Sequence, residues 1–170
     1  MLTPVGKIDL LRATATAHGL RTIVETGIYS GHGSSMEMLD LCPTVYLLDY
    51  DKDNCAAAMR ACPTATVVCG DSKWTLPTVC RKLTEPTLFW LDAHLIEEDG
   101  PLTHLYPCPL IDELEAIWEL APIGSVILID DLRMMGENGW PTIERLRQAA
   151  GVWEHRDEID DVMRLSGRLP

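Results

Sequence analysis

The sequence predicts a single α/β domain built on a doubly wound, mostly parallel sheet. Short β-branched and apolar runs recur along the chain, helix-forming segments separate them, and an acidic residue follows almost every run. Alternation of this kind is typical of a parallel sheet with helices on both faces. The 170 residues, 46% hydrophobic and 24% charged, are enough for one such domain with its own core.

The predicted strands are runs of Val, Ile, Leu, Phe or Thr that end in a charged or small polar residue. They cover residues 22–25, 45–49, 66–69, 87–92 and 125–130. The predicted helices cover residues 6–18, 33–41, 52–62, 72–82, 109–121 and 140–150. Two apolar stretches in the tail, residues 152–153 and 162–165, predict a weak hairpin that closes the sheet.

The composition excludes some classes of partner and indicates the cellular compartment. A net charge of −12 argues against nucleic acid and against an anionic membrane surface, since both need clustered Lys and Arg. The chain shows no transmembrane run and no apolar signal core near its start, which predicts a cytoplasmic protein. The six cysteines form no C-x-x-C pair and are predicted to be reduced and mostly buried.

Acidic residues stand at the ends of the predicted strands. Glu25, Asp49, Asp92 and Asp130 end four of them, and Asp71 follows the remaining one after a glycine. Ligands of parallel α/β sheets bind beyond the carboxyl ends of the strands. A solvated edge would explain one or two acids there, but not one after every strand. We therefore expect these carboxyl groups to converge on one crevice.

A glycine-rich turn follows the first predicted strand. The dinucleotide-binding fingerprint would need glycine at positions 27, 29 and 32, but Tyr29 and His32 stand at two of them. The spacing Glu25-x-Gly27-x-Tyr29-x-Gly31 instead resembles the first motif of class I S-adenosylmethionine (SAM)-dependent methyltransferases. It is most similar to the variant with an aromatic residue at the middle glycine, found in metal-dependent O-methyltransferases. The resemblance implies a Rossmann-like SAM-methyltransferase fold.

This resemblance also implies a cofactor site. Gly27 and Gly31 would let the backbone approach SAM closely. Glu25 would receive the SAM ammonium group, Asp49 would accept the ribose hydroxyls, and Asp71 would contact the adenine. Ser34 is also a candidate N-cap of the following helix. The full set of expected cofactor contacts is Glu25, Gly27, Tyr29, Gly31, Ser34, Asp49, Asp71, Ser72 and Asp92.

Three carboxylates predict a metal site. Asp92 follows the fourth strand, and Asp130 and Asp131 follow the fifth. Carboxylates so close would repel one another unless a cation lay among them, and hard oxygen ligands favour magnesium, calcium or manganese. The pattern resembles catechol, caffeoyl-CoA and macrolide-sugar O-methyltransferases, which implies that Asp92, Asp130 and Asp131 bind a divalent metal, with Mg²⁺ the first choice. The alternative is that Asp131 caps a turn and only Asp130 is catalytic.

The general base is less clearly marked. Asp131 stands where the catechol-type enzymes have Asn, and their catalytic lysine is replaced here by Leu95. His94 is the nearest candidate base, with Asp92 beside it as the second catalytic residue. His94 could instead hydrogen-bond Asp92 and orient it. Residues 93–108 are too long for an idle connection and are predicted to be a substrate lid.

The predicted function is SAM-dependent, divalent-metal-dependent methyl transfer to a hydroxyl of a small molecule or sugar. Because the chain offers no room for a separate substrate domain, substrate selection falls to the lid or to a neighbouring subunit of a homo-oligomer. One alternative is an oxidoreductase similar to cephalosporin hydroxylases on the same fold, although iron would favour two histidines and one carboxylate. The other is a catalytically silent SAM-binding or assembly protein.

Overall fold

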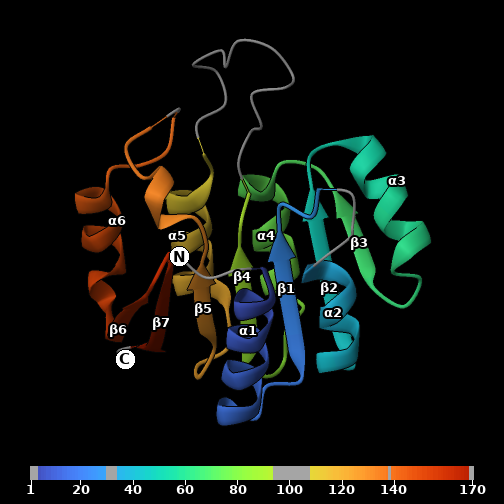
Figure 1. Ribbon diagram of the computed structural model, residues 1–170, viewed down its shortest axis with the longest axis horizontal. Coiled ribbons are helices and arrows are strands. Elements are labelled where there is room, and N and C mark those ends of the chain that lie inside the picture. Colours follow the sequence, from blue (N-terminus) through green and yellow to red (C-terminus); the bar gives the residue numbers. More distant parts are fainter. Residues whose placement is uncertain (1–3, 30–33, 94–107, 138, 169–170) are drawn as a thin grey trace.

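The computed structural model describes residues 4–29, 34–93, 108–137 and 139–168. Within these ranges seven strands form one sheet in the order β3-β2-β1-β4-β5-β7-β6 (Figure 1). Strands β1 to β5 are parallel, and β6 and β7 are antiparallel to their neighbours. The strand bounds are β1 Thr22–Thr26, β2 Thr44–Asp49, β3 Thr66–Cys69, β4 Thr87–Leu91, β5 Val126–Ile129, β6 Trp153–Ile159 and β7 Val162–Arg168.

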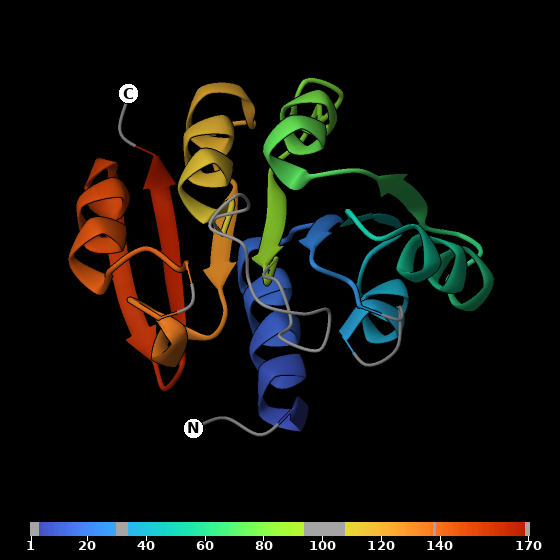
Figure 2. The same ribbon diagram turned by 90° about the horizontal axis from the view of Figure 1, so that it is seen from above.

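Helices cover both faces of the sheet (Figure 2). One core lies under α1, α2 and α3, and a second lies under α4, α5 and α6. The helix bounds are α1 Pro4–His18, α2 Ser34–Leu41, α3 Lys52–Ala61, α4 Ser72–Cys80, α5 Leu110–Leu120 and α6 Ile143–Ala149, with short 3₁₀ helices η2 Leu132–Met134 and η3 Ala150–Val152. This arrangement confirms the predicted doubly wound α/β domain.

Strands β1 and β4 occupy the centre of the sheet, and every residue in them is buried. Successive side chains of a strand point to opposite faces, so Val24 joins the core under α4 and α5 while Ile23 joins the core under α1. Burial on both faces explains why these strands read as continuous apolar runs. It also explains why a polar residue in such a strand, such as Glu25, is noteworthy.

The tail forms the predicted hairpin, but both of its strands are longer than the apolar stretches indicated. Strand β7 pairs with β5, and β6 forms the edge. Trp153 begins β6 and packs edge-to-face on Trp118 of α5, with ring centroids 5.4 Å apart. The rest of β6 is mostly exposed and charged, which protects an edge strand from pairing with other chains. Apolar periodicity therefore could not reveal its full length.

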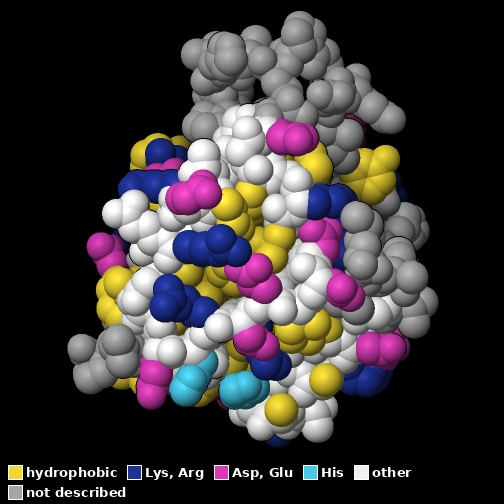
Figure 3. Space-filling view, turned by 60° about the vertical axis from the view of Figure 1, so that its left-hand side comes forward, with side chains coloured by type: hydrophobic (Ala, Val, Ile, Leu, Met, Phe, Trp, Pro, Cys, Tyr) yellow, Lys and Arg dark blue, Asp and Glu magenta, His cyan; other side chains and the backbone are white. Residues whose placement is uncertain are grey.

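Figure 3 views the molecule from the side that carries α6 and the hairpin, and acidic and basic side chains are interspersed there. Two exposed ion pairs on this side join Arg147 to Glu158 and Arg164 to Asp157. A hollow of about 420 Å³ is lined by Arg147, Ala150, Arg156, Asp157, Glu158 and Met163, none of which is a predicted site residue. In the described part of the chain, no helix combines the length and apolarity that crossing a bilayer requires.

Candidate active site at the carboxyl edge of the sheet

The predicted acidic residues lie together at the carboxyl ends of the parallel strands. Glu25 is the penultimate residue of β1, and Asp49 is the last residue of β2. Asp92 and Asp130 are the first residues after β4 and β5. Since the strand order is β2-β1-β4-β5, these four carboxyl groups come from adjacent strands. Four of the five carboxyl groups that were expected to converge therefore lie along one edge of the sheet.

Gly27 packs the turn after β1 onto the segment that follows β4. Its φ is +79°, and a Cβ atom at this position would lie 2.3 Å from the carbonyl oxygen of Asp92. The Asp92 amide also donates to the Thr26 carbonyl at 3.0 Å. Only glycine combines this backbone conformation with so close an approach. Gly27 therefore sets the position of Asp92 as well as the shape of the turn.

Asp49 holds the glycine-rich turn through neutral backbone donors. Its Oδ2 atom accepts hydrogen bonds from the amides of Ile28 at 3.1 Å and Tyr29 at 3.0 Å, and Oδ1 accepts one from the Asp51 amide at 2.9 Å. Tyr29 has a φ of +49°, an uncommon value for a residue other than glycine. Burial raises the pKa of Asp49, and these hydrogen bonds partly oppose that shift. This anchoring role was not foreseen from the sequence.

Glu25 is fully buried and bonded to hydroxyl groups at the start of α2. Ser34 Oγ donates to its Oε1 atom at 2.6 Å, and Ser35 Oγ donates to its Oε2 atom. The pKa of Glu25 is raised to about 7, chiefly by burial and in smaller part by the charges of Asp92 and Asp49, against the lowering effect of the two serines. Sequence reasoning named Ser34 but missed Ser35, although two adjacent serines that open a helix after a glycine-rich turn were a usable signal.

Asp71 and Ser72 begin α4, and a second buried glutamate lies behind them. Asp71 caps the helix by accepting from the Lys73 amide at 2.9 Å. Glu113 of α5 is buried, and burial raises its pKa to about 7 against the opposing effect of the Ser72 and Thr26 hydroxyls. Sequence reasoning missed Glu113. It lies on the apolar stripe of α5 rather than on its solvent face, which was the available signal.

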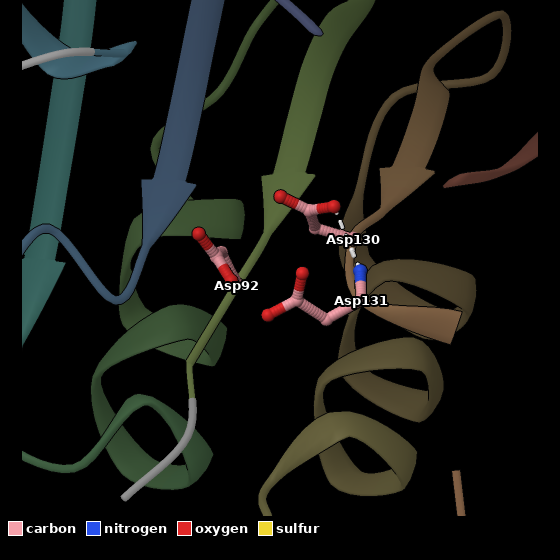
Figure 4. A group of neighbouring side chains, drawn as sticks. All are labelled: Asp92, Asp130 and Asp131. Atoms are coloured by element: carbon pink, nitrogen blue, oxygen red, sulfur yellow. Dashed lines mark hydrogen bonds between the residues drawn. The ribbon is translucent and has the colours of Figure 1, made fainter. Parts of the chain in front are cut away.

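Asp92, Asp130 and Asp131 form the predicted carboxylate cluster. One carboxylate oxygen of each lies within 4.8 Å of the others, and Figure 4 shows the side chains pointing toward one another between the ends of β4 and β5. Asp131 has a φ of +58°, its amide donates to Asp130 Oδ1 at 2.7 Å, and its side chain makes no capping bond to η2. This geometry favours the role of Asp131 in the cluster over its alternative role as a cap.

Among the described residues, two basic side chains contact this cluster, and sequence reasoning missed both. Lys7 Nζ lies 2.6 Å from Asp130 Oδ1 and 3.2 Å from Asp131 Oδ1. Arg133 Nη1 lies 2.6 Å from Asp131 Oδ1 and also bonds Asp161. The signal for Lys7 was topological. A helix that precedes the first strand and packs on the sheet must run back along it, so its first turns lie at the carboxyl edge.

The charges in the cluster act on one another strongly. Burial raises the pKa of Asp130, the nearby Asp92 raises it further, and Lys7 lowers it. Burial alone would lower the pKa of Lys7, but Asp130 and Asp131 outweigh burial and leave that pKa above its usual value. The donor set of three converging carboxylates fits a hard divalent cation.

Some predicted site residues lie outside the described ranges. These are Gly31, His94 and the stretch 94–107 of the predicted lid. The described ends of that lid lie close together, because Cys108 Sγ is 3.5 Å from the carbonyl oxygen of Ala93. The segment therefore leaves and rejoins the domain next to Asp92.

Solved structures with the same fold are numerous, although no protein-family model and no curated protein sequence matches the chain. An O-methyltransferase from Bacillus cereus in complex with SAH is 14% identical, with a TM-score of 0.65 over 98% of this chain and 82% of that one. The O-methyltransferase TomG from Streptomyces achromogenes, in complex with SAM, is 15% identical, with a TM-score of 0.64 over 95% and 80% of the chains. The protein has a SAM-methyltransferase fold.

A third similar structure contains a metal. MycE, a methyltransferase of the mycinamycin biosynthetic pathway in complex with Mg, SAH and mycinamycin VI, is 14% identical with a TM-score of 0.68. The match covers 94% of this chain but only 49% of MycE, so this chain spans about half the length of that methyltransferase. At such identities these similarities establish the fold.

Proposed function

We propose that the protein is a SAM-dependent methyltransferase that methylates a hydroxyl group of a small molecule or sugar. The observation that carries this proposal is the pair of buried carboxyl groups, Glu25 and Asp49, beside the glycine-rich turn of a SAM-methyltransferase fold. Their described side-chain and backbone donors are neutral hydroxyls and N–H groups, which do not cancel the charge of either group when it is ionised. Acidic groups with uncharged partners suit SAM, which carries a sulfonium and an ammonium group.

In this proposal the cofactor lies across the ends of β1, β2 and β3. Glu25 binds the ammonium group of SAM, and Asp49 binds the ribose through Oδ1, for which the described residues supply a single donor, the Asp51 amide. Asp71 and Ser72 contact the adenine. Trp74, in the first turn of α4, has 71% of its surface exposed, so it adds an apolar surface on this side. The exposure of Trp74 also argues against packing in the core.

We further propose that Asp92, Asp130 and Asp131 hold a divalent cation, with Mg²⁺ as the first choice. When bound, such an ion would orient the acceptor hydroxyl and lower its pKa. The residues of this chain then have separate tasks. Glu25 and Asp49 position the methyl donor. Gly27 packs the turn after β1 against Asp92 and so sets the distance between the methyl donor and the carboxylate cluster.

His94 is the proposed general base. It follows Asp92 by two residues, and an imidazole with a pKa near 6.5 suits proton removal at neutral pH. If this role is correct, His94→Ala lowers the maximal rate by roughly 10²–10⁴-fold with little change in metal affinity. A variant that regains the full rate at saturating metal would make His94 a residue that supports Asp92 instead.

A methyl-transfer assay tests the proposed function. Labelled SAM is incubated with hydroxylated small molecules and sugars in Mg²⁺ buffer, and the transferred label is counted. We expect transfer that a chelator abolishes while SAM binding persists, and we expect Asp130→Ala to behave like the chelator. Full transfer in excess chelator would remove the metal from the mechanism. A protein that fails to bind SAM would refute the methyltransferase assignment itself.

A further inference from the structure

Lys7 contacts two of the three carboxylates that make up the candidate metal site. Its ammonium nitrogen is 2.6 Å from Asp130 Oδ1, 2.7 Å from Asp130 Oδ2 and 3.2 Å from Asp131 Oδ1. Both oxygens of Asp130 and one of Asp131 therefore already face a positive charge. A divalent metal binds carboxylates through the same lone pairs, at roughly 2.0–2.6 Å. The metal and the ammonium group cannot share these oxygens without strong repulsion between them.

The two basic side chains of the cluster are held differently. Arg133 is tied to Asp161 through both its guanidinium and its backbone amide, which lies 2.8 Å from Asp161 Oδ1. The described polar contacts of Lys7 go only to Asp130 and Asp131. Its side chain is 20% exposed and has a flexible four-carbon stem, so it can swing into solvent. Lys7 can leave the cluster, whereas Arg133 is anchored.

We propose that Lys7 is a resident cation of the carboxylate cluster and that a divalent metal must displace it to bind. This inference rests on the metal site of the proposed function and adds the competitor. In the metal-free protein Lys7 pairs with Asp130 and Asp131, two of the three converging carboxylates, and its side chain leaves them when metal enters. Metal occupancy is thereby linked to the N-terminal helix.

Metal binding by charge variants tests this competition. Mn²⁺ is titrated into the folded protein without SAM, and the free ion is measured by electron paramagnetic resonance. Lys7→Met keeps the length of the stem and removes the charge, so we expect Mn²⁺ to bind about tenfold more tightly than to the wild type, or better. Lys7→Arg keeps the charge and should give no such gain. Equal or weaker binding to Lys7→Met would overturn the proposal.

A matched control separates local competition from net charge. Lys82 is exposed and follows α4 on the opposite, amino edge of the sheet, so Lys82→Met removes the same charge far from the cluster. Its Mn²⁺ affinity should equal that of the wild type. An equal gain in both methionine variants would show a general charge effect and would contradict displacement of Lys7.

A second measurement uses the wild-type protein and does not depend on the folding of any variant. Amine acylation is followed at each lysine by mass spectrometry, with and without Mn²⁺. We expect Mn²⁺ to speed the labelling of Lys7 several-fold, because the ammonium group loses its carboxylate partners, and to leave Lys82 unchanged. Unaltered labelling of Lys7 at saturating Mn²⁺ would overturn the proposal.

The outcomes also separate this inference from the proposed function. Mn²⁺ binding that is insensitive to Lys7 leaves the metal site in place and refutes only the exchange. No Mn²⁺ binding by the wild type or Lys7→Met refutes both the metal site and the exchange, with Lys7 then a permanent ion-pair partner. SAM binding, measured separately in chelator, decides the methyltransferase assignment.

Discussion

The buried carboxyl groups in the two halves of the carboxyl edge have different partners. On the side of β1 and β2, Glu25 and Asp49 accept hydrogen bonds from hydroxyl and amide groups that carry no charge. On the side of β4 and β5, Asp130 and Asp131 contact the cations Lys7 and Arg133. Neutral donors fix a carboxyl group without cancelling its charge, whereas a cation both fixes and neutralises it.

This difference fits the ligand proposed for each half. Carboxyl groups that bind only neutral donors can, once ionised, pair with a cationic ligand from solution, such as the proposed SAM. A cluster that already holds a cation favours exchange of that cation for another of higher charge. Gly27 joins the two halves, because its backbone approaches that of Asp92 more closely than any Cβ would allow.

Gly27→Ala should have the largest effect on stability, since it disturbs both the turn after β1 and the backbone of Asp92. The added methyl would combine left-handed strain with a 2.3 Å contact to Asp92, and we expect a loss of about 4 kcal/mol in the free energy of unfolding. Urea denaturation measures this loss. Gly19→Ala is the matched control, because its φ is +63° but nothing lies within 4 Å of the added Cβ. Gly19→Ala should lower the free energy of unfolding by about 1 kcal/mol. Equal losses in the two variants would contradict the proposed contact.

Glu113→Gln tests whether a buried acid whose partners are uncharged stays protonated at neutral pH. The pKa of Glu113 is raised from 4.5 to about 7, so the folded state holds an extra proton between these values. Stability therefore falls as pH rises through this window, by about 3 kcal/mol at pH 8. The amide variant should be more stable than the wild type at pH 8 and similar to it near pH 4.5. Thermal unfolding at both pH values measures this.

The control for Glu113→Gln lies on the same helix. Glu115 is exposed, so Glu115→Gln should leave the pH dependence unchanged. Glu25 shifts in the same direction as Glu113, so the slope of stability against pH in Glu113→Gln should shrink without vanishing. An unaltered slope would mean that Glu113 is ionised at neutral pH.

Asp49→Ala should weaken SAM binding by about 1–3 kcal/mol, the usual cost of losing charge-assisted hydrogen bonds. Part of this loss would come from the turn, because Asp49 also holds the amides of Ile28 and Tyr29. Calorimetry on the folded variant measures it. Asp51→Ala, which removes the cap of α3, should affect SAM less. Unchanged affinity in Asp49→Ala would move the ribose contact to Asp51 or reject the SAM assignment.

The last prediction, which is small close to neutral pH, concerns the pH dependence of SAM binding. Glu25 has a pKa of about 7 in the free protein and must ionise to pair with the ammonium group. SAM affinity should therefore fall by up to about tenfold for each pH unit below 7. Glu25→Gln should bind SAM more weakly and with less dependence on pH. Equal pH profiles for the two proteins would remove Glu25 from the cofactor site.

The fold and the acidic edge could be predicted because they follow from local pattern. Buried parallel strands read as apolar runs, and the carboxyl groups of Asp92 and Asp130 stand directly after them. The partners of these groups could not be read in the same way. Lys7 and Asp130 are 123 positions apart, and their contact depends on how α1 lies across the sheet. Long-range pairs of this kind have no sequence spacing that identifies them.

The same limit applies to backbone shape. The left-handed conformations of Tyr29 and Asp131 are uncommon for residues other than glycine, so composition gives no sign of them. They occur where a buried carboxylate binds the backbone amide, Asp49 for Tyr29 and Asp130 for Asp131. Both left-handed residues thus coincide with a hydrogen bond to a buried carboxylate, and the sequence alone shows only the acids.

We propose that the side of β1 and β2, with Glu25 and Asp49, binds SAM independently of the side of β4 and β5, with Asp130, Asp131 and Lys7. Titration of SAM into the metal-free protein in excess chelator, followed by calorimetry, tests it most directly. We expect one SAM per chain, with the same affinity in the wild type and in Lys7→Met. Binding of SAM that requires metal or depends on Lys7, or no binding of SAM at all, would contradict it.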